Sequence, residues 1–477
     1  MASRLTQASP NRGFEAGDTC GQLRRRTEPQ KSPQIGNTSR YLGSGQNGPY
    51  GRLARRDFLA PHRLNLYSIA LTIGIVAFLG SLTVIAPTAR ADDGFQTFLG
   101  ALWPDAKAIG VSRKTFDTAL AGIAPDYSLP DLDLPSRPQV DNQGQAEFTK
   151  TAADYIQKSY MENLAGQGRA FFNQHKAALE RIQTATGVDP YILVAIWGRE
   201  TAYGSYKLPH DAIKVLATEA FAGRRKDLFR AELVAALKML EMGVPRSDMR
   251  SSWAGAVGLT QFMPSEYLKY AADGDGDGKT DIWRSIPDAL ASAAQQLAGK
   301  GWQRGEGWGY EVRLGPKSDC ALEGPPDARP IADWVQLGFS RANGHAFSAN
   351  EMKQTAYLMM PAGTYGPAFL APENFKVIRL YNTSDLYALF VGHLSDRIRG
   401  GGEFATPWAK FEQPKSKTVH DLQARLKALG YPMDKTDGKI GSNTRKQIGL
   451  YERSSGLKVD CWPSEAVLAH ANSNARK

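Results

Sequence analysis

Cysteine and histidine are scarce in this chain, and their scarcity excludes several kinds of active site. Its 477 residues hold three cysteines and seven histidines. They form no C-x-x-C or H-x-x-x-H pattern, so a zinc site is not expected. The chain also lacks a G-x-S-x-G elbow and a convincing Cys–His arrangement, which argues against a serine or cysteine nucleophile. Any catalytic group must therefore come from another residue type.

Excess charge is also scarce once the first residues are set aside. The formal net charge is +10. Residues 1–91 hold 12 Lys and Arg against 4 Asp and Glu, which leaves 46 basic and 44 acidic residues for the other 386. Because the remainder is nearly neutral, a nucleic-acid-binding surface is not expected to be its main purpose.

The basic first segment has the features of an export signal. Arg55-Arg56 precedes an apolar run from Ile69 to Ala86, which ends near the small-residue site Ala89-Arg90-Ala91. This order predicts export to the periplasm, cleavage, and a mature chain that starts at Asp92 without a membrane span. The arginine pair resembles a twin-arginine signal. A retained membrane anchor is the alternative, because the run approaches spanning length. No cysteine lies near the cleavage site, so a lipid anchor is not expected.

Two cysteines remain after the leader, Cys320 and Cys461. Two thiols in an oxidising compartment can form a disulfide. They are far apart in the sequence and lie in different predicted domains, so both a disulfide and two separate thiols stay open.

The pattern of the chain predicts a mainly α fold with some β structure (α+β). Helical periodicity dominates residues 92–315 and returns at 383–398, whereas short apolar pieces at 308–360 predict a small strand-containing insertion. Residues 400–417 are rich in Gly, Pro and Lys, as linkers are. The last 59 residues fit a small three-helix unit. We therefore expect a leader (1–91), a main domain (92–398), a linker (399–418) and a C-terminal domain (419–477).

A single glutamate stands on the apolar face of one predicted helix. In DPYILVAIWGRE, Asp189 can cap a helix whose first residue is Pro190. Leu193, Ile196 and Glu200 then share one face. A carboxyl group there loses solvation, so we expect its pKa to rise and the protonated acid to be favoured. The plain alternative is a glutamate at a helix end that is partly solvated or paired with a nearby arginine.

An acidic loop, DGDGDGKTDIW, spans residues 273–283. Asp273, Asp275 and Asp277 stand at positions 1, 3 and 5 of an EF-hand-like loop, and the Lys279 carbonyl stands at position 7. Position 12 is an arginine, so we expect Asp288 to take the role of the usual glutamate. An all-oxygen ligand set favours calcium; an acidic turn without an ion is the alternative.

Two further stretches offer polar groups suited to a sugar. SWAGAVGLTQFMPSEY (252–267) places small residues before Gln261, whose amide can both donate and accept hydrogen bonds. RLYNTSDLYALF (379–390) supplies Tyr381, Asn382 and Tyr387, which offer flat apolar faces and an amide. Each stretch alone is equally explained by helix packing and capping.

Taken together, these motifs resemble a known family. G-R-E-T-A-Y-G, S-W-A-G-A-V-G-L-T-Q-F-M-P-S and R-L-Y-N-T-S-D-L-Y-A, in this order, resemble the membrane-bound lytic murein transglycosylase B family over about residues 95–398. L-Q-A-R-L-K-A-L-G-Y and D-G-K-I-G-S-N-T in the C-terminal domain resemble the small peptidoglycan-binding domain.

The resemblance implies a lysozyme-like helical main domain that cuts the MurNAc–GlcNAc β-1,4 bond of peptidoglycan without water and leaves 1,6-anhydroMurNAc ends. Matched by position, Glu200 would be the catalytic acid, and the sugar would contact Ser252, Gln261, Tyr381, Asn382 and Tyr387. Glycan strands are the expected partner, calcium would be structural, and no organic cofactor is expected. A water-using muramidase and a catalytically silent wall-binding scaffold are the alternatives. The sequence leaves endo or exo action, peptide-stem preference, oligomeric state and the true start codon open.

Overall fold

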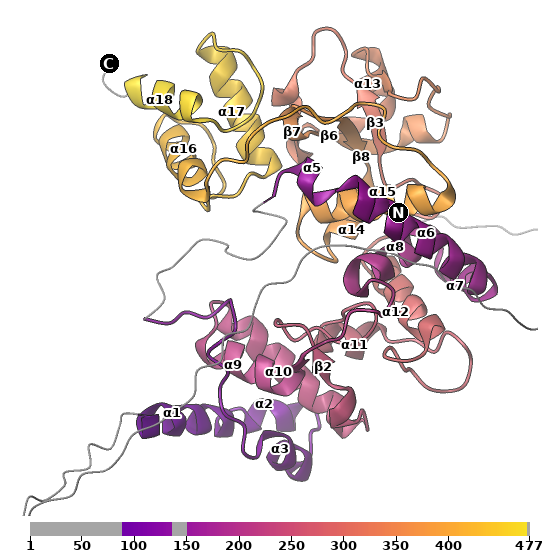
Figure 1. Cartoon of the computed structure of the whole chain (residues 1–477), viewed down its shortest axis with the longest axis vertical. Coiled ribbons are helices and arrows are strands. Elements are labelled where there is room, and N and C mark those ends of the chain that lie inside the picture. Colours follow the sequence, from indigo (N-terminus) through magenta and orange to yellow (C-terminus); the bar gives the residue numbers. More distant parts are fainter. Residues whose placement is uncertain (1–87, 136–149, 475–477) are drawn as a thin grey trace, which may run out of the picture. The chain divides into compact units, whose positions relative to one another are not determined.

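A computed structural model describes residues 88–135 and 150–474, with side chains from Asp93 onward (Figure 1). Up to residue 87, the predicted export signal therefore lies outside the described residues, and its predicted cleavage site at residues 89–91 falls within the first helix, α1 (Thr88–Gly100). Within the described ranges, no helix has both the length and the apolar character needed to cross a bilayer.

The main domain is mostly helical, as its sequence pattern predicts. Its first part contains short two-stranded pairing between β1 (His210–Asp211) and β2 (Arg250–Ser251). Its helices, in chain order, are α1 (Thr88–Gly100), α2 (Trp103–Ala108), α3 (Arg113–Leu120), α5 (Ala152–Tyr155), α6 (Lys158–Gln174), α7 (Lys176–Thr186), α8 (Pro190–Thr201), α9 (Ala212–Ala222), α10 (Lys226–Glu241), η1 (Arg246–Asp248), α11 (Pro264–Tyr270) and α12 (Ile286–Gly299).

The predicted insertion forms a five-stranded antiparallel sheet in the order β4-β6-β8-β3-β5. It extends beyond the expected limit of residue 360, because β8 pairs between β6 and β3. The strands are β3 (Tyr310–Arg313), β4 (Arg329–Pro330), β5 (Ser340–Arg341), β6 (Thr355–Met359) and β8 (Ala368–Ala371), with β7 (Pro361–Thr364), α13 (Ile331–Gln336) and the short turns η2 (Cys320–Leu322), η3 (Pro325–Asp327) and η4 (Glu351–Lys353) between them.

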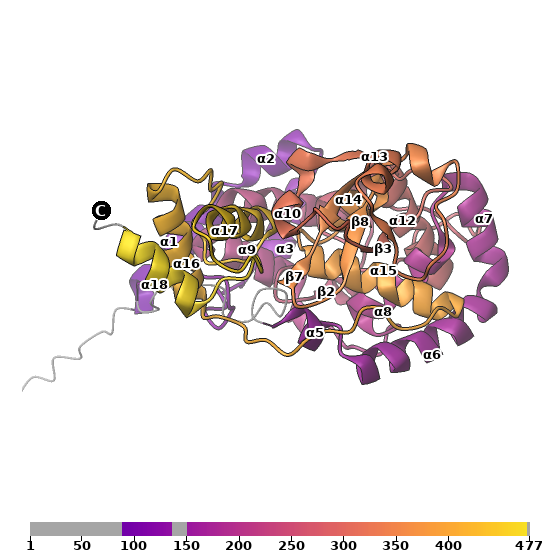
Figure 2. The same ribbon diagram turned by 90° about the horizontal axis from the view of Figure 1, so that it is seen from above.

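Two helices from distant parts of the chain cross the centre of the main domain. After α14 (Glu373–Arg379), helix α15 (Asp385–Arg399) packs along α8 and α6, and Figures 1 and 2 show α15 beside α8. Both α8 and α15 are apolar on several sides and are largely buried in one continuous hydrophobic core. This pairing brings the end of α8 close to the start of α15.

The stretch between α15 and the C-terminal domain has neither helix nor strand. The Glu311 carboxylate accepts hydrogen bonds from the N–H groups of Ala405 and Thr406, at 2.8 and 2.7 Å. The Trp408 ring lies so close to Gly366 that a Cβ there would approach it to 2.2 Å. Backbone hydrogen bonds and the Trp408 ring therefore attach this predicted linker to the main domain.

The C-terminal domain is a three-helix unit of α16 (Ser416–Ala428), α17 (Ser442–Ser454) and α18 (Glu465–Ser473) around its own small core. It is joined covalently to the insertion, because Cys320 and Cys461 form a disulfide with a Cα–Cα distance of 6.0 Å. The structure thereby decides between the two states that the sequence left open for these cysteines.

Candidate active site

Glu200 lies in the last turn of α8, as the sequence predicts. The Asp189 side chain caps this helix by accepting the Tyr191 N–H at 2.9 Å, and Pro190 is its first residue. Leu193 and Ile196 are fully buried, whereas Glu200 is partly exposed. The carboxyl group therefore stands where an apolar helix reaches solvent.

The chain leaves α8 through a tight left-handed turn. Ala202, Tyr203 and Gly204 have φ angles of 46°, 58° and 79°. Such angles are uncommon for residues other than glycine. Gly198 allows the turn to fold back, because a Cβ there would lie 2.6 Å from the Tyr203 ring. Tyr203 is buried, and its hydroxyl donates to the Leu164 carbonyl at 2.9 Å. The buried side chain of Tyr203 thus anchors the backbone that follows Glu200.

Tyr387, from α15, donates its hydroxyl hydrogen to Oε1 of Glu200. Tyr387 is 1% exposed. Burial raises the pKa of this phenol well above its usual value, and the nearby Glu200 carboxylate raises it further. The phenol therefore keeps its proton at neutral pH and can act only as a hydrogen-bond donor toward the carboxylate.

Tyr381 stacks against Tyr387, with ring centroids 6.4 Å apart and an interplanar angle of 8°. Its hydroxyl donates to the Thr260 carbonyl at 2.6 Å. Burial, followed by the charge of Glu200, raises the pKa of Tyr381 well above its usual value. Both tyrosines from the third motif are consequently neutral groups beside the glutamate.

Gln261 lies in a turn closed by two backbone hydrogen bonds of 2.8 Å between Val257 and Phe262. Its own φ is 56°, and its side-chain amide donates to the Gly258 carbonyl at 3.0 Å. Gly258 has a φ of 75°, and a Cβ there would lie 2.7 Å from Ile282. The glycine is required both by its backbone angle and by the close approach of a neighbouring side chain.

The three motifs meet in a closed circuit of contacts. Thr201, next to Glu200, donates its hydroxyl hydrogen to the Leu259 carbonyl at 2.7 Å. The adjoining Thr260 carbonyl accepts from Tyr381, which stacks on Tyr387, which donates to Glu200. Residues separated by up to 187 positions thus surround one carboxyl group. No local pattern in the sequence indicated the roles of Thr201 and Thr260.

Two other predicted residues lie at the edges of the same motifs. The Ser252 hydroxyl accepts the Ala256 N–H at 3.3 Å, within the turn that opens the second motif. Asn382 is exposed and directly follows Tyr381. Their side chains can therefore reach solvent from the second and third motifs.

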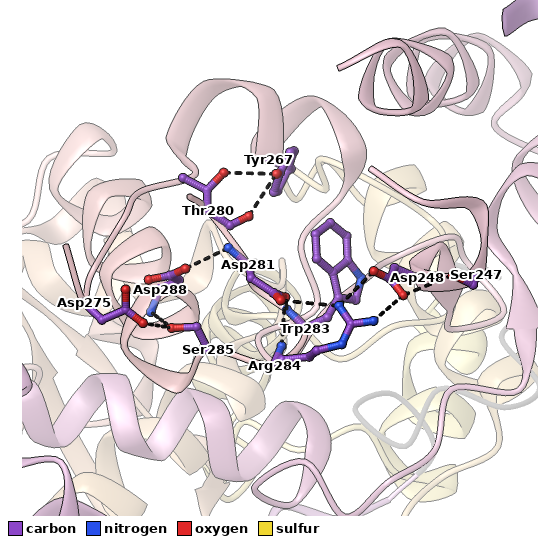
Figure 3. Close-up of polar contacts among 10 residues, drawn as sticks. All are labelled: Ser247, Asp248, Tyr267, Asp275, Thr280, Asp281, Trp283, Arg284, Ser285 and Asp288. Carbon is purple, nitrogen blue, oxygen red and sulfur yellow. Dashed lines mark hydrogen bonds and ion pairs between the residues drawn. The ribbon is translucent and has the colours of Figure 1, made fainter. Parts of the chain in front are cut away.

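Three carboxylates of the acidic loop converge in space. Asp273, Asp275 and Asp288 each place a carboxylate oxygen within 4.8 Å of the others. Asp288 is 1% exposed and accepts the N–H groups of Gly274 and Asp281, at 2.8 and 2.7 Å. Figure 3 shows Asp275 and Asp288 near one another, with the Ser285 hydroxyl donating to Asp275 at 2.8 Å. This donor set suits a hard cation such as calcium.

The remaining loop residues point to other partners. An Asp277 carboxylate oxygen accepts the Lys279 N–H at 2.8 Å, and Asp277 is outside the group of three. Arg284, at the twelfth loop position, instead forms a two-pronged pair with Asp248 at 2.6 and 2.8 Å (Figure 3). Backbone N–H groups of Gly278 and Gly276 lower the pKa of Asp273, which keeps this carboxylate ionised.

Comparison with known families gives two matches along the chain. The family described as "Transglycosylase SLT domain" matches residues 94–396. The family described as "Putative peptidoglycan binding domain" matches residues 415–470. The first match covers well over half of the chain and contains the three motifs.

Individual relatives agree with this result. The chain is 30% identical over 247 residues to membrane-bound lytic murein transglycosylase B of Escherichia coli K12. The aligned region covers 51% of this chain and 66% of that protein, so the chain spans just under two thirds of its relative's length. SltB3 of Pseudomonas aeruginosa, solved with NAG-anhNAM-pentapeptide, is 39% identical with a TM-score of 0.72 over 79% of this chain and 99% of that one. Escherichia coli Slt35, solved with calcium, is 27% identical with a TM-score of 0.52 over 65% and 93%.

Proposed function

The chain belongs to the lytic transglycosylases of the SLT domain family, and from this premise we propose how it acts on peptidoglycan. We infer that it cleaves the MurNAc–GlcNAc β-1,4 bond without consuming water and leaves 1,6-anhydroMurNAc ends. The observation that carries the proposal is the hydrogen bond from the Tyr387 hydroxyl to Glu200, within the circuit of contacts that joins the three motifs.

In the first step, Glu200 acts as the general acid. Its Oε1 is held by the Tyr387 hydroxyl, so the proton is carried by Oε2 and passes to the leaving glycosidic oxygen. The bond from C1 of MurNAc to that oxygen breaks as the proton arrives. The N-acetyl group of the same sugar stabilises the positive charge at C1, as in substrate-assisted glycosidases.

In the second step, the same carboxylate acts as the general base. It takes the proton from the C6 hydroxyl of MurNAc, whose oxygen bonds to C1 and closes the anhydro ring. The proton lost from Glu200 in the first step is thereby returned to it. Tyr381 and Tyr387 cannot replace it as a base near neutral pH, because their pKa values are raised. One carboxyl group is sufficient for both steps.

The other residues of the three motifs would contact the sugar. Gln261 and Asn382 carry amides that can pair with hydroxyl and acetamido groups, and Ser252 carries a hydroxyl. The flat face of Tyr381 suits the apolar face of a sugar ring. The C-terminal domain would hold the enzyme on the glycan polymer and raise its local concentration. The expected place of action is the periplasm.

Calcium would bind the acidic loop through Asp273, Asp275 and Asp288. Asp277 and the Lys279 carbonyl, which the loop pattern also suggests, remain candidate ligands. A bound cation would neutralise the converging carboxylates and stiffen the segment that follows Gln261. It would have no part in the bond-breaking steps.

Product analysis tests the proposal. Purified sacculi are digested with the mature enzyme, and the masses of the released muropeptides are measured by mass spectrometry. Transglycosylation yields non-reducing ends that are lighter by one water than hydrolytic products. Glu200→Gln should reduce release by orders of magnitude while circular dichroism stays unchanged. Mainly reducing MurNAc ends would instead identify a muramidase.

A further inference from the structure

Arg445 is a buried arginine of the C-terminal domain that points into the main domain. Its side chain is 3% exposed, and it pairs with Glu323, which is fully buried, through contacts of 2.5 and 2.9 Å. A further nitrogen donates to the Ile440 carbonyl at 2.9 Å. Burial raises the pKa of Glu323, whereas the charge of Glu323 raises that of Arg445 despite burial. Such a pair contributes little net stability, so another role is reasonable.

The same guanidinium also reaches the helix that carries Tyr387. Its Nη2 lies 3.7 Å from a carboxylate oxygen of Asp385, and Arg379 pairs with the other oxygen at 2.8 Å. Asp385 is the first residue of α15. The preceding Ser384 caps this helix by accepting the Tyr387 N–H at 3.3 Å. Two arginines, Arg379 and Arg445, therefore pair with the carboxylate at the start of the helix that carries Tyr387.

We propose that Arg445 is a positioning residue for catalysis: by holding Asp385 it fixes the start of α15 and so keeps the Tyr387 hydroxyl on Glu200. The proposal rests on the catalytic role of Glu200 given above. It makes the C-terminal domain a part of the active-site scaffold as well as a wall-binding unit. Catalytic groups tolerate only displacements of well under 1 Å, so a less firmly held start of α15 is expected to lower kcat.

The domain has other attachments that do not involve Arg445. The disulfide between Cys320 and Cys461 remains when Arg445 is replaced, as does the exposed pair of Arg453 with Asp319. Removing the guanidinium should therefore leave the C-terminal domain attached. Arg453 lies on the same helix, α17, and its replacement serves as a matched control.

The experiment measures kcat and KM of the full-length mature protein on soluble, uncross-linked glycan strands. We expect Arg445→Gln and Asp385→Asn each to lower kcat by about 10-fold or more, with KM changed less than about twofold. Arg453→Ala should keep the wild-type kcat. Arg445→Lys, which retains the charge, should recover part of the loss.

A double-mutant cycle separates positioning from general damage. Tyr387→Phe removes the hydroxyl that Arg445 is proposed to position. In this variant, a second change, Arg445→Gln or Asp385→Asn, should therefore lower kcat by less than about twofold compared with Tyr387→Phe alone. The proposal would be overturned if the losses in kcat from the single variants multiply in the double variants. It would also be overturned if either Tyr387→Phe or Asp385→Asn has the wild-type kcat. If Arg445→Gln does not fold, Asp385→Asn decides, because it leaves the Glu323 pair intact. Glu200→Gln, assayed alongside, tests the catalytic role of Glu200 separately, because full activity of this variant would refute that role.

Discussion

Glu219 is a buried glutamate whose protonation should control the stability of the fold. It lies on α9, is fully buried, and neither carboxyl oxygen has a hydrogen-bond partner among the described residues. Its pKa is raised from 4.5 to about 7, chiefly by burial and then by the nearby Asp131, whereas Arg225 opposes the rise. We therefore expect the folded protein to hold a proton here that the unfolded chain releases.

The sign of the effect follows from where the proton is bound. Below pH 4.5 both states are protonated at this position, so the group does not favour either. Between pH 4.5 and about 7 the unfolded chain loses its proton first, so the free energy of unfolding falls as the pH rises. At about 1.4 kcal/mol for each pH unit, the loss has an upper limit of about 3 kcal/mol.

The test compares wild type with Glu219→Gln in urea unfolding at pH 4.5 and at pH 8. The amide cannot ionise, so the variant should gain about 1–3 kcal/mol relative to wild type between the two pH values. Glu180→Gln is the control, because the Glu180 side chain is 60% exposed and should show no such change. A stability difference between Glu219→Gln and wild type that is the same at both pH values would refute the reasoning.

Three further predictions concern other parts of the molecule. Calcium at about 100 times its dissociation constant should stabilise the fold by about 2.7 kcal/mol; melting curves with calcium and with chelator should differ in wild type but coincide in Asp275→Asn. Replacing both disulfide cysteines, Cys320→Ser with Cys461→Ser, should cost at most about 5 kcal/mol, because the bridge closes a loop of 141 residues; a reducing agent should lower the melting temperature of wild type only. Gly258→Ala should lower both the melting temperature and sacculus digestion, since a Cβ there meets Ile282; unchanged values would show that the turn adapts.

Local patterns predicted those features that depend on neighbouring residues. The cap at Asp189 and the buried face of α8 follow from the spacing of a few side chains, and the structure confirms both. The same holds for the three helices of the C-terminal domain, where Leu422 and Leu426 fall on one buried stripe. Short apolar pieces of sequence also indicated the insertion, although its last strand lies past the expected boundary.

Long-range contacts could not be predicted in the same way. Nothing near Tyr387 in the sequence reveals that its hydroxyl meets Glu200, 187 positions earlier. The partner of Arg445 is likewise 122 positions away. In the acidic loop, spacing alone favours Asp277 as much as Asp275, but the folded backbone turns the Asp277 carboxylate toward the Lys279 N–H. The tertiary fold decides such pairings, and a single sequence carries little record of them.

Under the proposed mechanism, Glu200 must keep its position through two proton transfers. Among the described residues, three of the four non-glycine positions with positive φ lie in the turns of the first two motifs: Ala202, Tyr203 and Gln261. Each such angle costs on the order of 1–3 kcal/mol unless the surroundings enforce it. Here the enforcing contacts include the buried Tyr203 ring and the Thr201 bond to the second motif. The strain is thus concentrated in the two turns that carry the proposed site, where the mechanism requires the backbone to stay in place.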